Sequence, residues 1–344
     1  MKKNSLGKFA ILCLLTYGLL ASAQGPVLRE DVPDTYTVVK GDTLWDISAT
    51  FLKNPWMWPE IWHVNTQIQN PHLIYPGDVI RLIYLDGKPR LTVTERTGPL
   101  YKLTPEARVV PADQAIQTIP LDKINSFLTR SRIVTEEELE TAPYVVSGYH
   151  ENLLTGAGDK LYARGVFEQG STVYGVYRRG QEYKDPITKE ELGLQALDIG
   201  SGRLRAVDGD IGTLNITRTT EEIRLGDRLL RQEERPIDST FFPSPPSGEL
   251  EGLILAVEGG LTQVGNMDVV VINLGEREGV VPGNVFAVYK RGGKVKDRVE
   301  GGSVQLPDQR AGLLMVFRTF EKLSFGLVLE ADRGLRVNDK VRNP

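Results

Sequence analysis

The pattern of hydrophobic and polar residues predicts a small mixed module near the start of the chain. Short β-branched runs at Tyr36–Val39 and Val79–Leu82 predict two strands. Between them, one face of a predicted helix carries residues at helical spacing, namely Leu44, Ile47, Ser48 and Phe51. A second helix is expected from Pro59 to Asn65, because proline is favoured in a first helical turn. The predicted order of strands and helices in residues 34–86 is therefore β-α-α-β.

After this module the pattern predicts a connector and then a long β-rich region. Several prolines follow Asp86, and helical patterns at Leu121–Arg132 and Thr135–Glu140 predict short helices within a connector at residues 87–144. Thr135 followed by Glu138 is a capping-box pattern. Beyond residue 144 short β-branched runs and frequent glycines favour strands and turns.

The β-rich region contains an internal repeat. Val173–Gly180 resembles Val285–Gly292, and Ile223–Leu229 resembles Leu335–Val341, both pairs 112 positions apart. Lys184-Asp185 and Lys296-Asp297 share that offset. Two duplicated units are therefore expected at residues 145–234 and 251–344, each a small barrel or sandwich, with the proline-rich segment 236–247 as a linker. The fold class expected for the whole chain is α+β and multidomain.

The first residues have the pattern of an export signal. Lys2, Lys3 and Lys8 precede an apolar run at Phe9–Leu20, and Ala21-Ser22-Ala23 supplies the small residues of a cleavage site. We expect a signal peptide at residues 1–23, cleavage after Ala23 and a periplasmic location. The alternative is an uncleaved anchor, although the run is short for spanning a bilayer.

Composition excludes several classes of function. The 344 residues carry 41 basic and 45 acidic side chains, a net charge of −4, without the basic blocks that nucleic-acid binding requires. One cysteine and three histidines leave no basis for a disulfide framework or a zinc site. Asp208-Gly209-Asp210 is better explained as a solvated turn than as a calcium site. We expect no catalytic residues, no metal and no cofactor.

The mixed module resembles the LysM family. The resemblance is carried by Tyr36–Ser48, Asn65 and Ile74–Ile80, with a departure in the tryptophan-rich segment Leu52–Trp62. It implies binding to N-acetylglucosamine-containing glycans such as peptidoglycan, in a shallow groove between two loops. The residues that the resemblance places there are Gly41, Asp42, Thr43, Leu44, Leu73, Ile74, Tyr75 and Pro76.

All four tryptophans lie between Trp45 and Trp62. They could form a platform on which sugar rings stack, or they could supply apolar area to a module too small for an ordinary core. Core packing is expected for Trp58 and Trp62, whereas both interpretations stay open for Trp45 and Trp56.

The complete layout resembles the type IV pilus secretin-associated proteins of Gram-negative bacteria, which join an N-terminal LysM to a region similar to the C-terminal region of flagellar assembly protein T. Ala142–Val146 contributes to this resemblance. It implies a non-catalytic protein that anchors the outer-membrane secretin of the pilus to peptidoglycan. Two alternatives remain, a LysM-targeted cell-wall hydrolase and a peptidoglycan-anchoring scaffold unrelated to pili.

Overall fold

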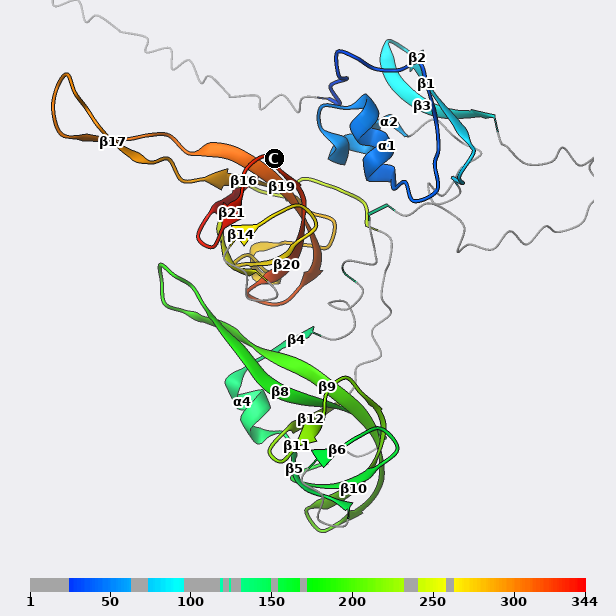
Figure 1. Ribbon diagram of the computed structural model, residues 1–344, viewed down its shortest axis with the longest axis vertical. Coiled ribbons are helices and arrows are strands. Elements are labelled where there is room, and N and C mark those ends of the chain that lie inside the picture. The colour runs from blue at the N-terminus through cyan, green and yellow to red at the C-terminus, as the bar shows by residue number, and fades with distance from the viewer. Residues whose placement is uncertain are drawn as a thin grey trace, which may run out of the picture.

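The computed structural model describes residues 25–62, 74–95, 118–119, 124, 131–149, 154–167, 172–231, 241–257 and 263–344. The expected signal peptide, Leu73 and most of the expected helix Leu121–Arg132 lie outside these residues. The described part is mostly strand with few helices, and it comprises a small mixed module followed by two strand-rich units (Figure 1).

The N-terminal module is a three-stranded antiparallel sheet with two helices. Its sheet order is β1-β2-β3. Its elements are β1 (Thr35–Thr37), α1 (Leu44–Phe51), the 3-10 turn η1 (Pro55–Met57), α2 (Trp58–Ile61), β2 (Val79–Leu85) and β3 (Lys88–Glu95). Helix α1 begins where the sequence predicts it, with Thr43 as N-cap in a capping box with Asp46.

Two details of this module correct the sequence interpretation. The second helix starts at Trp58 and not at Pro59, because η1 already turns the chain from Pro55. The connector does not begin at residue 87 as expected, since Asp86 and Gly87 adopt φ of 50° and 73° and turn the chain back into β3. Leu91 of β3 is fully buried in the core of the module, so β3 is part of the module.

The first strand-rich unit closes into a six-stranded ring. The order is β10-β7-β5-β12-β8-β9, and β9 also pairs with β10. The ring strands are β5 (Tyr144–Gly148), β7 (Lys160–Arg164), β8 (Val173–Lys184), β9 (Glu191–Asp208), β10 (Ile211–Thr219) and β12 (Arg228–Arg231). A short pair, β6 (Leu154–Thr155) with β11 (Ile223–Arg224), lies beside it.

The segment before this ring is partly a strand. β4 (Ser131–Val134) pairs with β9, so the expected helix does not extend to Arg132. The next helix, α4 (Glu136–Thr141), confirms the second helical pattern, and the Thr135 hydroxyl accepts the Glu138 N–H at 3.1 Å.

The second unit is a closed barrel in the order β13-β15-β20-β19-β16-β22. Its barrel strands are β13 (Glu251–Val257), β15 (Val269–Ile272), β16 (Val285–Lys290), β19 (Gln309–Thr319), β20 (Ser324–Ala331) and β22 (Lys340–Arg342). The additional elements are β14 (Gln263–Val264), the 3-10 turn η5 (Glu276–Glu278), β17 (Lys294–Lys296), β18 (Ser303–Gln305) and β21 (Leu335–Arg336).

The second barrel repeats the first in strand order and in register. Tyr174 pairs with Gly202 in the first unit, and Phe286 pairs with Leu314 in the second, so both residues shift by 112 positions. Gly226 and Asn338, at φ of 88° and 72°, occupy the same turn before β12 and β22. Both units therefore share one topology, and that topology is a barrel.

The segment expected to be a free linker packs onto the second barrel where the structure describes it. The Ser244 N–H donates to the Gly283 carbonyl at 3.0 Å, and the Ser244 carbonyl accepts the Val285 N–H at 2.9 Å. Phe241 is buried in a cluster that includes barrel residues. These pairings stabilise residues 241–247 as an extension of the barrel.

Candidate functional site

Two loops of the N-terminal module lie side by side at one end of its sheet. One follows β1 and leads into α1, and the other precedes β2. Val38 joins them with two backbone hydrogen bonds, since its carbonyl accepts the Gly77 N–H at 2.8 Å and its N–H donates to the Asp78 carbonyl at 2.9 Å. The structure thus places the two predicted groove segments next to each other.

Each loop is held by an aspartate that follows a glycine. The Asp42 carboxylate accepts the Val39 N–H at 2.8 Å, and the Asp78 carboxylate accepts the Tyr75 N–H at 3.1 Å. Gly41 and Gly77 precede them at φ of 100° and 96°, a conformation that side chains other than glycine rarely adopt. The backbone of both loops is therefore fixed before any ligand arrives.

Tyr36 adds a further support to the first loop. Its hydroxyl donates to the Asp42 carboxylate at 2.9 Å. Burial, together with the hydrogen bond to Asp42, raises the pKa of Tyr36 to about 12. The hydroxyl consequently remains protonated and continues to donate at any pH near neutrality.

The predicted groove residues differ in what they present to solvent. Gly41 and Pro76 are exposed, and Asp42 and Tyr75 are half-buried. Thr43 is buried and caps α1, while Leu73 lies outside the described residues.

Two of the predicted groove side chains are not at the surface. Leu44 and Ile74 are fully buried in the core of the module. Both were predicted as groove residues, and because both side chains point into the core, they could contribute to a groove only through their backbone. They support the loops from below, and the side chains left at the surface of the two loops include Tyr75 and Pro76.

The tryptophans do not form an exposed platform. Trp58 and Trp62 are buried in the core of the module, as expected. Trp45 is buried in a separate cluster with Ile119 and Phe241, and Trp56 is partly buried against both clusters. The open question about Trp45 and Trp56 is thus answered in favour of packing.

A contact from outside the module reaches the first loop. The backbone N–H of Trp45, at the start of α1, donates to the backbone carbonyl of Thr118 at 3.3 Å. Thr118 lies more than seventy positions along the chain, so no local signal in the sequence indicates this contact. Tyr36 was also missed, although its position six residues before an aspartate in a tight turn makes the hydrogen bond possible.

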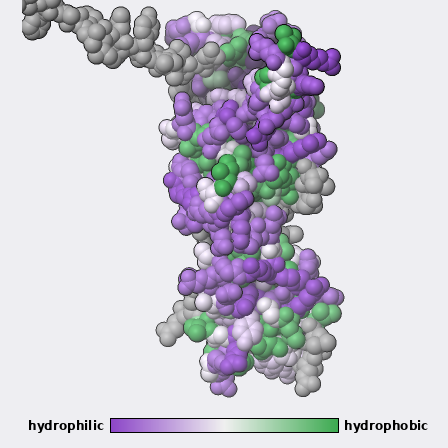
Figure 2. All heavy atoms as spheres, turned by 90° about the vertical axis from the view of Figure 1, so that its left-hand side faces the viewer, coloured by the Kyte–Doolittle hydropathy of each residue, from purple (hydrophilic) through white to green (hydrophobic). Residues whose placement is uncertain are grey.

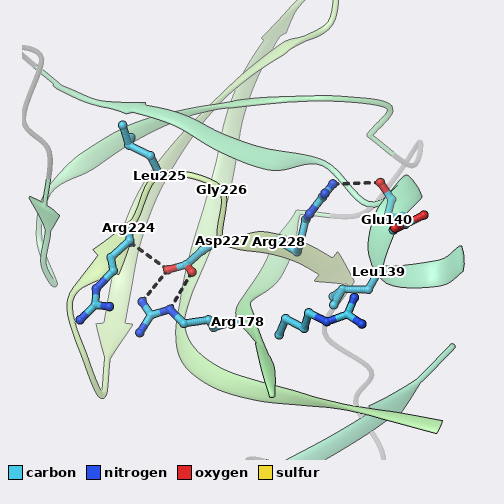
Figure 3. A pocket seen from close by; sticks show the side chains of 9 residues that line it. Leu139, Glu140, Arg178, Arg224, Leu225, Gly226, Asp227 and Arg228 are labelled. Atoms are coloured by element: carbon cyan, nitrogen blue, oxygen red, sulfur yellow. Dashed lines mark hydrogen bonds and ion pairs between the residues drawn. The ribbon is translucent and has the colours of Figure 1, made fainter. Parts of the chain in front are cut away.

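A hollow lies on the first barrel, lined by several arginines (Figure 3). It has a volume of about 430 Å³ and is lined by Leu139, Glu140, Arg178, Arg179, Arg224, Leu225, Gly226, Asp227 and Arg228. The Arg178 guanidinium makes two hydrogen bonds of 2.9 Å to the Asp227 carboxylate and one of 3.0 Å to Glu221. Arg228 donates to the carbonyls of Glu140 and Ala142.

These pairings make the hollow a structural network. Asp227 also accepts the Arg224 N–H at 2.8 Å, so its carboxylate is fully engaged and cannot serve as a free base. The acidic turn Asp208-Gly209-Asp210 is similarly engaged, since Asp210 pairs with Arg164 at 2.7 Å, an ion pair that lowers the pKa of Asp210. Among the described residues, no three His, Cys, Asp or Glu side chains are grouped to hold a metal.

Within the described ranges, no helix has the length and apolar character needed to cross a membrane.

The geometry defines a small binding module with a pre-formed pair of loops, and comparison with known proteins identifies its family. Residues 36–82 match the LysM domain family, which confirms this part of the sequence interpretation. The match indicates a module that binds glycans of the peptidoglycan or chitin type. The chain is also similar to the uncharacterized protein YqbP of Bacillus subtilis (strain 168), with 38% identity over 63 residues, which cover 15% of this chain and 29% of that protein.

Proposed function

We propose that the chain is a non-catalytic peptidoglycan-binding protein of the periplasm that anchors a type IV pilus secretin to the cell wall. The observation that carries the glycan-binding part is the LysM match at residues 36–82 together with the two loops fixed against each other through Val38. A ligand that meets rigid loops loses less free energy to ordering of the protein.

The groove would hold the glycan mainly through its backbone. With Leu44 and Ile74 buried, the groups left at the two loops are peptide N–H and C=O groups, the half-buried Tyr75 and the exposed Pro76. Acetamido sugars offer an amide to the backbone and an apolar ring face to such side chains. No charged side chain is needed, which suits the net charge of −4.

The compartment and the partner rest on the sequence. Residues 1–23 have the pattern of an export signal, which supports a periplasmic location. The layout of one LysM module before a β-rich half supports the secretin as partner. We assign the secretin contact to the two barrels, because the LysM module is committed to glycan.

The two rival functions predict different observations. A cell-wall hydrolase would need an acid and a base or nucleophile facing each other in a cleft. A zymogram with purified sacculi would show lysis by a hydrolase and none by a scaffold. A general anchor unrelated to pili would bind sacculi equally well but would not co-purify with a secretin.

Binding to sacculi tests the glycan part. We expect the full chain to co-sediment with purified sacculi, and Tyr75→Ala to weaken that binding by about 3- to 10-fold, because one ring-sized contact is lost. Tyr84→Ala is the matched control, since Tyr84 is an exposed tyrosine on β2 of the same module. Equal binding by a chain that lacks residues 34–95 would contradict the assignment.

Affinity purification from envelopes tests the secretin part. A tagged chain lacking residues 34–95 should still co-purify with the secretin, while its co-sedimentation with sacculi is lost. If the truncated chain is exported and stable but leaves the secretin behind, the assignment of the barrels to that contact is wrong, whatever the glycan result.

A further inference from the structure

The hairpin formed by β8 and β9 reaches out of the first barrel and docks onto the end of the second. In Figure 1 it extends from the green barrel toward the barrel above it. At its tip, the Asp185 carboxylate accepts a hydrogen bond of 2.7 Å from the Asn273 amide. Glu190 pairs with Arg277 at 2.7 and 3.0 Å and with Lys322 at 3.0 Å.

Two apolar side chains of this hairpin are buried by the contact. Tyr183 is 2% exposed and Leu192 is 5% exposed, in one cluster with Leu323 and Phe325 of the second barrel. A hydrophobic centre surrounded by charged pairs is the usual composition of a stable interface. The first hairpin is thus an arm that joins one unit to the next.

The second unit carries the same arm, and the described structure places nothing against it. The hairpin of β17 and β18 extends away from the second barrel (Figure 1). At an offset of 112, Tyr183 corresponds to Val295 and Leu192 to Val304, which pair across the hairpin. These valines are 44% and 48% exposed. Two apolar residues therefore stand at the positions that are buried in the first arm.

The turns at the two tips are also alike. The Asp185 carboxylate accepts the N–H groups of Ile187 and Thr188 at 2.8 Å each. The Asp297 carboxylate accepts those of Val299 and Glu300 at 2.8 and 3.1 Å. The second arm consequently presents its carboxylate in the same local geometry as the first.

The end of the first barrel corresponds to the surface that receives the first arm. Val145 pairs with Ala163 in the first barrel, and Ile254 pairs with Ile272 in the second. Arg164, which follows Ala163 at the end of β7, therefore occupies the position of Asn273, which follows Ile272 after β15. Asp210, in the β9–β10 turn, occupies the position of Lys322. Two residues after Arg164 in the sequence, Val166 is 86% exposed.

We propose that the β17–β18 hairpin docks onto this end of the first barrel in a second copy of the chain, repeating between molecules the contact that joins the two units within one. Asp297 then faces Arg164, whose Nε donates to Asp210 at 2.7 Å within the barrel, so that the guanidinium is shared between the two carboxylates in place of the hydrogen bond between Asp185 and Asn273. Val295 and Val304 are covered by the barrel end near Val166. The proposal rests on the repeated interface and is independent of the glycan ligand and of the secretin.

The association is expected to be weaker than its intramolecular counterpart. Gly302 occupies the position of Glu190, so the ion pairs with Arg277 and Lys322 have no equivalent. Figure 2, a view from the side toward which both arms extend, shows hydrophobic patches scattered in a hydrophilic surface. Because the contact joins two different surfaces, each added copy leaves a free arm for the next, and the assembly is a ring or a row.

Sedimentation velocity of the full chain over a range of concentrations tests the proposal. We expect the average mass to rise with concentration for the native chain. Val295→Asp and Val304→Asp should each weaken association on the order of 10-fold or more, because each would place a carboxylate in an apolar contact. The matched control is Val281→Asp, an exposed valine of the same barrel outside the hairpin.

Crosslinking locates the contact. In chains carrying Cys13→Ser, a mixture of Asp297→Cys and Arg164→Cys should give a crosslinked pair with a short bismaleimide, whereas Asp297→Cys mixed with Tyr84→Cys should not. The proposal is overturned by a native chain that stays monomeric at every concentration. It is equally overturned by association that the two aspartate variants leave unchanged or by crosslinking that is equal in both mixtures.

Discussion

At the scale of single residues, aspartates organise the turns of every part of the chain. Among the described residues, the aspartates that close turns by accepting the backbone N–H three residues earlier include Asp42, Asp78, Asp159, Asp227, Asp268 and Asp339. A short carboxylate closes such a turn in place of a backbone group and leaves its own backbone free for the next element. The two LysM loops therefore use the same type of carboxylate-closed turn as the two barrels.

Asp42→Ala should loosen the first LysM loop. The substitution removes the acceptor of both the Val39 N–H and the Tyr36 hydroxyl, so we expect the free energy of unfolding of the module to fall by about 1–2 kcal/mol. All four tryptophans lie in this module, so tryptophan fluorescence during urea denaturation reports its unfolding together with the loss of its contacts to Phe241 and Phe242. Tyr36→Phe, which removes one of the two bonds, should cost less than Asp42→Ala. An equal or larger cost would mean that the carboxylate does not hold the loop.

The residue scale also shows why the groove was only partly predictable. The apolar spacing that places Leu44 on the buried face of α1 is visible in the sequence, and it is incompatible with a side chain in the groove. Transfer from a family motif marks which segments meet the ligand. It does not distinguish a residue that offers its backbone from one that offers its side chain.

At the scale of elements, β3 shows how a strand can be overlooked. Its sequence begins Lys88-Pro89-Arg90, and proline and charge are typical of a connector. Pro89 is tolerated because it lies near the start of the strand and at the edge of the sheet, as β3 pairs only with β2 among the described strands. Burial of Leu91 makes the strand part of the core, and that contact is not visible in the local pattern.

Leu91→Ala tests the contribution of β3. Loss of a fully buried leucine should lower the free energy of unfolding of the LysM module by about 2–5 kcal/mol, measured by tryptophan fluorescence in urea. Tyr84→Ala on the neighbouring strand should change it by less than about 1 kcal/mol, since Tyr84 is exposed. A similar effect of the two substitutions would show that β3 is dispensable for the module.

At the scale of the whole molecule, the ion pairs between the barrels make their contact depend on pH. Hydrogen bonds from Arg277 and Lys322 lower the pKa of Glu190 from 4.5 to about 2. The stabilisation is therefore fully present above about pH 4.5, and it is lost as the pH falls toward 2 and Glu190 becomes protonated.

We expect the contact between the two barrels to weaken, and partial separation to begin before either barrel unfolds, when the pH is lowered through this range. Small-angle scattering would detect the separation, and circular dichroism would follow the strands. Glu190→Gln should weaken the contact at neutral pH and reduce its dependence on pH in this range, leaving the part due to Asp185, whose carboxylate accepts from Asn273. A native chain whose scattering is constant from pH 7 to the onset of strand loss would contradict the prediction.

The whole-molecule scale separates what the sequence predicts from what it does not. The 112-residue repeat predicts pairings such as Tyr174 with Gly202 and Phe286 with Leu314, because equal local sequences form equal strands. It does not reveal that one arm is docked and the other exposed, since the difference lies in what each arm finds beside it. The contact of Thr118 with Trp45 is equally invisible, because it joins segments far apart in the chain.

The packing of the LysM module has a mechanical consequence. Trp58 lies against Phe242, with ring centroids 5.8 Å apart, and the backbone N–H of Trp45 donates to the Thr118 carbonyl. Under the proposed function, a pull on the wall reaches the second barrel through these contacts as well as along the polypeptide. The anchor would be stiff while the contacts hold and would yield once they break, which limits the peak force that reaches the glycan.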